Sequence, residues 1–308
     1  MRGDKLRTRQ PATTTTSGLN QVWIIRMDNL ICRAFDYLDS HDPSKVRKGL
    51  RQLELLMAKI CLKTGEPSDP PYNTLEELGS DVCFLEYARL QGRFEYNIAS
   101  RLIALLEKLL GSGNEENDLT IIATLDLLHG SLLLHRESRA LFRRKPTMEL
   151  LLDLLEPCNC PAIQQAALLT LVAALLDAPD NLRTLESVDG LLAITSLFKA
   201  RSTSRQLKLK LMEFLYFYLM PETASIPRAE QRDSVPGILQ RSPSKLAKAF
   251  GPGGGGDADG NLRRSRSDSI GAVVLTTEEK QALLSRYLSN VDDLVRDLRG
   301  CTPFGVVC

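Results

Sequence analysis

The three histidines are the side chains best suited to proton transfer or metal binding. They are His41, His129 and His135. His129 and His135 stand six residues apart, so on a helix they point in different directions and cannot chelate one metal ion as an i, i+4 pair would. We interpret both as polar positions along a helix.

The cysteines also fail to make a metal site. Cys158 and Cys160 form a C-x-C pair in a loop bounded by prolines, but zinc needs four ligands and no second Cys/His pair stands at ligand spacing. An odd number of cysteines, mostly at apolar helix positions, indicates reduced and buried thiols in a cytosolic or nuclear protein. The seven are Cys32, Cys61, Cys83, Cys158, Cys160, Cys301 and Cys308.

Phosphate chemistry lacks its sequence signatures. The chain has no G-x-x-x-x-G-K-[S/T] loop, no kinase lysine, catalytic-loop and D-F-G set, and no G-x-S-x-G turn. A cysteine phosphatase needs an arginine six residues after its cysteine, in a loop that wraps the phosphate. Ala166 stands at that distance from Cys160, and Cys83 and Arg89 have this spacing but lie within one expected helix, 74–89, and not in a loop. The sequence therefore predicts a protein that is not an enzyme and uses no cofactor.

Two basic clusters are candidates for binding a partner. Arg143, Arg144 and Lys145 lie between two expected short helices, and a second group surrounds the start of an expected long helix. Each cluster is either a solvated charged rim or a patch complementary to an acidic partner, acting mainly on docking rate and orientation. The second group comprises Arg205, Lys208 and Lys210.

Two serines stand in patterns that protein kinases prefer. Ser242 begins an S-P-x-K sequence typical of cyclin-dependent kinase sites, and Arg264 and Arg266 precede Ser269 as basophilic kinases require. Phosphorylation would add nearly two negative charges to an arginine-rich segment. Ser242 and Ser269 are therefore candidate regulatory sites.

An internal repeat predicts the elements that carry these residues. Leu125 and Leu128 recur as Leu168 and Leu171, 43 residues later, and the same offset takes Leu168 to Leu211. A helical period of this length is typical of armadillo or HEAT units. Long helices are expected at 119–135, 162–177 and 205–219 with two short helices between successive ones. Before them, helices are expected at about 19–38, 74–89 and 94–110. This pattern predicts an all-α, armadillo-like, right-handed helical solenoid.

The remaining segments have contrasting compositions. Residues 1–18 are expected to be a disordered arm, 19–221 the solenoid, 222–275 a disordered Ser/Gly/Arg-rich linker, 276–299 a C-terminal helix and 300–308 a tail. The last helix starts with a Thr276/Glu279 capping box. Its apolar side must pack on the solenoid or on a partner, and it includes Leu284, Leu288, Val291 and Val295.

Composition excludes two classes of partner. The net charge is +1 and aromatic residues make up 6% of the chain, which argues against nucleic acid. The longest nearly apolar run, 166–176, is shorter than the ~20 residues that a membrane-spanning helix needs. We expect a cytoplasmic protein that binds neither nucleic acid nor membrane.

Several blocks of sequence carry a family resemblance. They are Phe94–Ala99, Leu125–His135, Leu211–Glu222, and the tail Thr277–Leu298 followed by Pro303-Phe304-Gly305. These blocks resemble the fungal cell division control protein 14 family of the septation initiation network, which is distinct from the phosphatase of similar name.

The resemblance implies a non-catalytic regulatory subunit. Members of this family are expected to bind a germinal-centre-class (sterile-twenty-like) protein kinase at the spindle pole body and to promote septum formation and cytokinesis. The resemblance transfers no binding residue to this chain, because these blocks contain no site motif.

Two other functions remain open from the residues alone. The first is a general armadillo-like adaptor for another protein. Adaptors that read extended peptides usually carry a ladder of asparagines, and none occurs at the 43-residue offset, which favours a whole-domain partner. The second is an enzyme with an unrecognised site.

Overall fold

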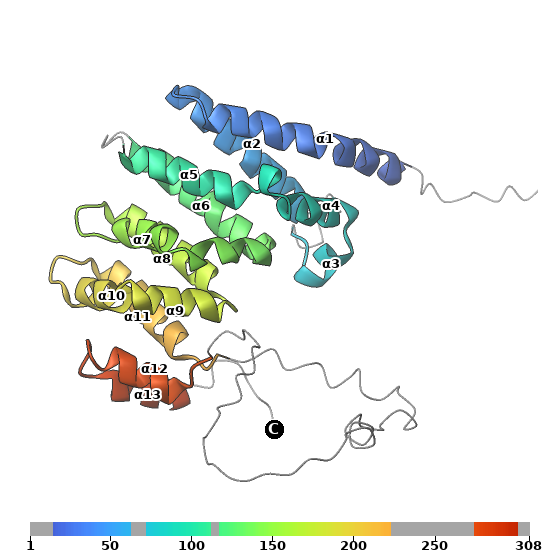
Figure 1. The fold of residues 1–308 in the computed structure, drawn as a ribbon. Helices are drawn as coiled ribbons and strands as arrows, with labels where there is room; N and C mark the ends of the chain where they lie inside the picture. Colours follow the sequence, from blue (N-terminus) through green and yellow to red (C-terminus); the bar gives the residue numbers. More distant parts are fainter. Residues whose placement is uncertain (1–14, 63–71, 112–116, 223–273, 301–308) are drawn as a thin grey trace, which may run out of the picture.

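A computed structural model describes residues 15–62, 72–111, 117–222 and 274–300 of the chain. Within these ranges the backbone is helical, contains no strand, and has one isolated bridge, between Leu62 and Tyr72. The helices stack in chain order from α1 to α13 (Figure 1). The predicted all-α helical solenoid is confirmed.

The stack begins with the pair α1 (Thr15–Leu38) and α2 (Pro43–Cys61). Asp42 caps α2 by accepting a 2.9 Å hydrogen bond from the backbone N–H of Ser44, and Pro43 occupies the first turn. Gly49 lets the two helices touch, since a Cβ there would lie 2.9 Å from the carbonyl oxygen of Ala34. The helix α1 begins at Thr15 rather than at the expected Leu19.

The next elements are shorter than predicted because polar side chains divide them. They are α3 (Leu75–Ser80), α4 (Val82–Gln91), η1 (Phe94–Tyr96) and α5 (Ile98–Gly111). Asp81 accepts from the N–H of Phe84 at 2.8 Å and starts α4, where one helix over 74–89 was expected. Asn97 likewise accepts from the N–H of Ser100 at 2.8 Å and starts α5 after η1.

The repeat region has one long helix followed by two short ones, twice. The order is α6 (Asp118–Leu134), η3 (Arg136–Arg143), α7 (Lys145–Asp153), α8 (Pro161–Leu175), α9 (Pro179–Ser187), α10 (Gly190–Lys199) and α11 (Arg205–Leu219). The helices α2, α6, α8 and α11 pack side by side in one row. Within this row α6 and α8 are parallel, and Thr170 donates a 3.2 Å hydrogen bond to the carbonyl of Leu125.

The residues related by the repeat form the core of the stack. Leu125, Leu128, Leu171 and Leu211 are fully buried, and Phe214 is 1% exposed. They belong to one continuous cluster that runs from α1 to α13. The repeat therefore exists because each long helix buries its leucines against the next one.

The C-terminal segment forms two helices, α12 (Thr277–Leu284) and α13 (Val291–Gly300), instead of the single helix predicted. The backbone turns after Leu284, whose carbonyl accepts from the N–H groups of Tyr287 and Leu288 at 3.0 Å each. The turn folds both helices onto α11 (Figure 1). We call α12 and α13 together the C-terminal hairpin.

Candidate functional site

The first predicted basic cluster lies where η3 meets α7. Arg143, Arg144 and Lys145 are all exposed. Arg143 is engaged with its own chain, since its Nη2 lies 2.9 Å from the Oδ2 of Asp180 at the start of α9. Arg144 and Lys145 present their charges to solvent, so they are the members of this cluster that are free to meet an acidic partner.

The second predicted cluster lies on the first half of α11. Arg205 is exposed, and Lys208 and Lys210 are half-buried. Lys210 forms a 2.8 Å ion pair with Glu213 one turn away. A surface pair of this kind contributes little to stability, and it reduces the charge that Lys210 can offer to a partner.

The two clusters lie at opposite ends of the long helices. The ends of α8 and α11 meet, because Leu176 and Met220 line one cavity near Asp177. Asp180, the partner of Arg143, lies in the first turn of α9, which starts close to the end of α8, so the first cluster is at this end. Arg205 begins α11 at the other end, about 20 Å away along a helix of 15 residues. The structure therefore does not join the clusters into one patch.

The four apolar residues proposed as a partner surface are buried in the protein. Leu284, Leu288, Val291 and Val295 are at most 5% exposed and belong to the main core. The C-terminal hairpin uses them to cover α11. Of the two alternatives, packing on the solenoid is observed, and the assignment of these residues to partner binding is corrected because side chains buried in the core offer no docking surface.

The candidate phosphorylation sites Ser242 and Ser269 lie outside the described residues. The proposed linker also falls outside them, except for residues 222, 274 and 275 at its two ends. Glu222 is not part of a featureless linker. Its side chain is 7% exposed and contacts α9, α12 and the backbone N–H of Leu275.

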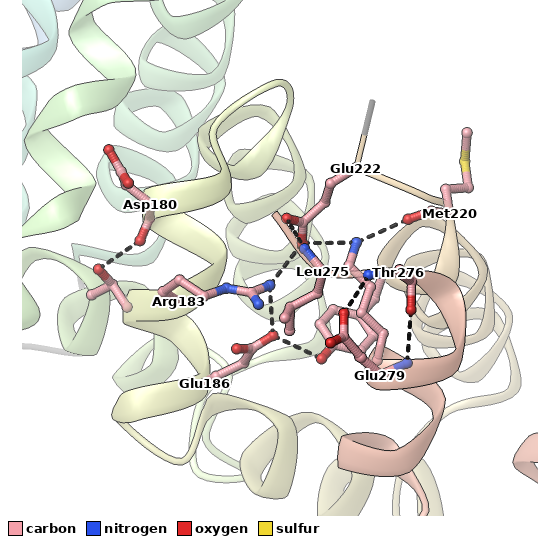
Figure 2. A network of polar contacts seen from close by, with 11 residues as sticks. Asp180, Arg183, Glu186, Met220, Glu222, Leu275, Thr276 and Glu279 are labelled. Atoms are coloured by element: carbon pink, nitrogen blue, oxygen red, sulfur yellow. Dashed lines mark hydrogen bonds and ion pairs between the residues drawn. The ribbon is translucent and has the colours of Figure 1, made fainter. Parts of the chain in front are cut away.

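A buried charge network surrounds Glu222 (Figure 2). The carboxylate Oε1 lies 2.7 Å from Arg183 Nη2 on α9 and 3.0 Å from Lys280 Nζ on α12, and Oε2 accepts from the N–H of Leu275 at 3.0 Å. Arg183 also lies 3.0 Å from Glu186, which accepts a 2.8 Å hydrogen bond from the hydroxyl of Tyr218. The network thus ties α9 and α11 to the C-terminal hairpin.

Burial shifts the acid–base equilibria of this network. It lowers the pKa of Lys280 and raises the pKa of Glu186, in each case against the attraction of the neighbouring opposite charge. It also raises the pKa of Tyr218, helped by the adjacent Glu186 carboxylate. The two cations and two carboxylates compensate one another in a largely buried site.

A lysine, a tyrosine and two carboxylates in a buried site could in principle catalyse proton transfer. The Lys280 ammonium is already engaged, however: it donates to Met220 O at 2.9 Å, pairs with Glu222, and lies 5.4 Å from the centre of the Tyr218 ring. A cavity of about 450 Å³ adjoins it. The contacts of Lys280 with Met220 O and Glu222 hold α12 against the end of α11.

The same pattern of a cation at a helix end recurs through the stack. Arg139 donates to the carbonyls of Leu132 and Leu176, at 3.1 and 2.7 Å, near the ends of α6 and α8. Lys280 does so at the end of α11. The last carbonyls of a helix lack intrahelical partners and carry partial negative charge, so these cations stabilise the turns between repeats.

The histidines and cysteines also have structural surroundings. His135 is buried, with Nδ1 2.8 Å from the Ser138 hydroxyl, and burial lowers its pKa and that of His129. Cys32 and Cys158 are exposed rather than buried as expected, and the three other described cysteines are half-buried. In the described ranges, no three metal-binding side chains come together.

The sequence did not predict this network. Arg183 and Glu186 lie in an expected short helix, Tyr218 lies in an expected long helix, and Glu222 follows the helix-ending Pro221. The one local signal was the Thr276/Glu279 capping box, which is present, with hydrogen bonds of 2.8 and 3.3 Å. That box fixed the start of α12 but gave no information about its partner helix.

Comparison with known proteins identifies relatives over almost the whole chain. Residues 27–304 match the family model described as "Cell division control protein 14, SIN component". The chain is similar to Cell division control protein 14 of Schizosaccharomyces pombe, with 31% identity over 288 residues that cover 91% of this chain and 97% of that protein.

No solved structure matches this chain. Among the helices of the described ranges, none has both the length and the apolar character needed to cross a membrane. The fold is therefore established from this structure, and the family from the sequence matches. This chain belongs to the cell division control protein 14 family, whose members are components of the septation initiation network.

Proposed function

We propose that this chain is a non-catalytic regulatory subunit that binds a germinal-centre-class protein kinase and so promotes septum formation and cytokinesis. The observation that carries the proposal is the family match over residues 27–304, because it connects this chain to the septation initiation network. The match with the fission yeast protein supports it by covering nearly all of both chains.

The fold is consistent with a binding role. A stack of helical repeats presents an extended surface while each unit stays rigid through contacts with its neighbours. The polar groups that resemble a catalytic set serve instead to hold helix ends and the C-terminal hairpin. The chain would thus supply a surface, and the kinase would supply the chemistry.

The basic clusters would act on the encounter with the kinase. Arg144 and Lys145 offer charge at one end of the long helices, and Arg205 and Lys208 offer it at the other. Exposed charges of this kind mainly raise the association rate, and salt screens them. A partner that contacts both clusters has to span about 20 Å of the long helices.

We further propose that the complex is recruited to the spindle pole body and regulated by phosphorylation at Ser242 and Ser269. Both serines lie in kinase-preferred sequences between α11 and the C-terminal hairpin. Alanine at both positions should change the timing of septum formation in cells while leaving the melting temperature of the purified protein unchanged. Unchanged timing would remove both sites from the proposal.

The proposal is tested by co-expressing the full chain with a tagged germinal-centre-class kinase of the same organism. We expect the two proteins to copurify and to elute together in gel filtration. Kinase activity towards a generic substrate, measured with a kinase-dead partner, should be absent from the complex. The proposal would be contradicted if the two proteins failed to copurify both when the kinase carries the tag and when this chain carries it.

A further inference from the structure

The row of long helices carries an exposed leucine on each of its members. We call the outward side of α2, α6, α8 and α11 the long-helix face. Its leucines are Leu55 on α2, Leu119 and Leu133 on α6, Leu169 on α8 and Leu209 on α11, and all are exposed. Single exposed leucines are ordinary. Together these leucines give each long helix of the row an apolar side chain that a partner could contact.

A groove between α2 and α6 deepens this face. The two helices touch at one end, where a Cβ on Gly130 would lie 2.8 Å from the terminal carbon of Met57. Beside their N-terminal halves lies a cavity of about 490 Å³, whose apolar lining includes Leu50, Leu119 and Leu127. The groove is therefore lined by both helices and can take an apolar side chain.

Basic side chains lie on the first and last helices of the long-helix face, α2 and α11. Arg47 and Arg51 line the groove on α2, and in the described part of the chain no carboxylate lies within ion-pair distance of either. Arg205 and Lys208 lie near the N-terminus of α11, just as Arg47 and Arg51 lie near the N-terminus of α2. Parallel helix N-termini add partial positive charge there. Glu54 and Asp126 also line the groove, about a turn closer to Met57 and Gly130.

The backbone of this face offers nothing to an extended peptide. The N–H and C=O groups in the middle of α2, α6, α8 and α11 are bonded within their own helices, so a strand would find no main-chain partners. A helix has already satisfied its backbone and needs only side-chain contacts. Neighbouring helix axes lie about 9 Å apart, so the row spans about 27 Å from α2 to α11, the length of about 18 helical residues.

We propose that the long-helix face binds an amphipathic α-helix of a partner protein, with an apolar middle that covers Leu119 and Leu169 and acidic ends that meet Arg47 and Arg51 at one side and Arg205 and Lys208 at the other. The inference rests on the proposed function only in requiring a protein partner. It names the kind of element that the partner presents.

The test uses the full chain and a phage-displayed library of 20-residue peptides. Selected peptides are synthesised with a fluorescent label and titrated against the native chain and variants. Leu169→Glu and the pair Arg47→Glu/Arg51→Glu alter the face. Leu192→Glu on α10 is the matched control, because Leu192 is 46% exposed and Leu169 is 42% exposed. Circular dichroism and melting temperature verify that each variant is folded.

We expect selected peptides with apolar residues at i, i+3 or i+4, and i+7, acidic residues at their ends, and helicity that rises on binding. Leu169→Glu and the double arginine variant should each weaken binding at least tenfold, and Leu192→Glu should not. The inference is overturned if no peptide is enriched, if the enriched peptides are basic or extended, or if Leu192→Glu weakens binding as much as Leu169→Glu.

The same variants separate this inference from the proposed function. If the peptides behave as expected but the kinase does not bind the native chain, the proposed function fails and the long-helix face stands. If the kinase binds the native chain and Leu169→Glu equally well, and the peptides show no dependence on the face, the inference fails alone.

Discussion

Lys280 and Glu222 form a buried ion pair, with 3.0 Å between Nζ and Oε1, across the two ends of the segment 223–273. Their side chains are only 2% and 7% exposed. The pair fixes the C-terminal hairpin at one position on the stack, next to the last carbonyls of α11. The hairpin covers the apolar side of α11 that a further repeat would otherwise cover.

Removing the cation of this pair should destabilise the protein strongly. Lys280→Met leaves Glu222 buried with Arg183 as its remaining side-chain partner, and loss of one member of a buried pair costs about 3–5 kcal/mol. Chemical denaturation of the variant should show this loss. The double variant Lys280→Met/Glu222→Gln should recover part of the lost stability, because the side chain at position 222 is then neutral and no buried carboxylate lacks its lysine partner. A single variant as stable as the native protein would contradict the role of the network.

Gly49 should resist substitution although it lies inside a helix. Alanine normally stabilises a helix interior by about 1 kcal/mol relative to glycine. At Gly49 the new Cβ would press on the carbonyl of Ala34, so Gly49→Ala should destabilise the protein by about 1–3 kcal/mol. Gly79→Ala is the matched control, because nothing lies within 4 Å of its Cβ position. Equal effects of the two substitutions would show that α1 and α2 pack less closely than described.

The repeat core predicts large effects of truncation. Leu128 and Leu171 occupy equivalent positions of successive repeats and are fully buried. Leu128→Ala or Leu171→Ala should each cost about 2–5 kcal/mol in the free energy of unfolding. Chemical denaturation measures both. A cost below about 1 kcal/mol at either position would be incompatible with one continuous core.

Mild acid should weaken the fold through its histidines. Burial lowers the pKa of His129 and His135 below the ordinary value near 6.5. Groups with a depressed folded-state pKa contribute stability above the unfolded pKa and lose it as the pH falls through the folded pKa. The melting temperature should therefore fall between about pH 7 and pH 5.5, with at most ~1.4 kcal/mol per pH unit from each histidine.

Variants without these imidazoles provide the control for the acid effect. His129→Gln and His135→Gln should each reduce the slope of stability against pH in this range, whatever they do to stability at pH 7.5. Should the slopes of both variants equal that of the native protein, the acid sensitivity would come from other groups.

The repeat was readable from sequence because its signal is local and periodic. Leu125, Leu168 and Leu211 recur at one offset, and burial of the same side of each long helix enforces that offset. The predicted helix boundaries were less accurate where a single polar residue determines the start of a helix. Asp81 and Asn97 each start a helix with a single side-chain hydrogen bond, and nothing in the surrounding apolar pattern signals it.

Contacts between distant residues could not be predicted from these patterns. Leu284 and Val291 were correctly identified as apolar side chains that need a cover, but the turn that brings both onto α11 depends on the shape of that helix. Glu222 was placed in a linker because it follows Pro221 and precedes polar sequence. Its role appears only when α9, α11 and α12 meet.

The central claim is that this chain binds a germinal-centre-class kinase as a protein surface without catalytic residues of its own. Isothermal titration calorimetry of the purified full chain against that kinase, at two salt concentrations, tests it most directly. We predict saturable binding at a fixed ratio, weakened by Arg205→Glu/Lys208→Glu more strongly at low salt than at high salt. Absence of binding heat, together with absence of comigration in gel filtration, would contradict it.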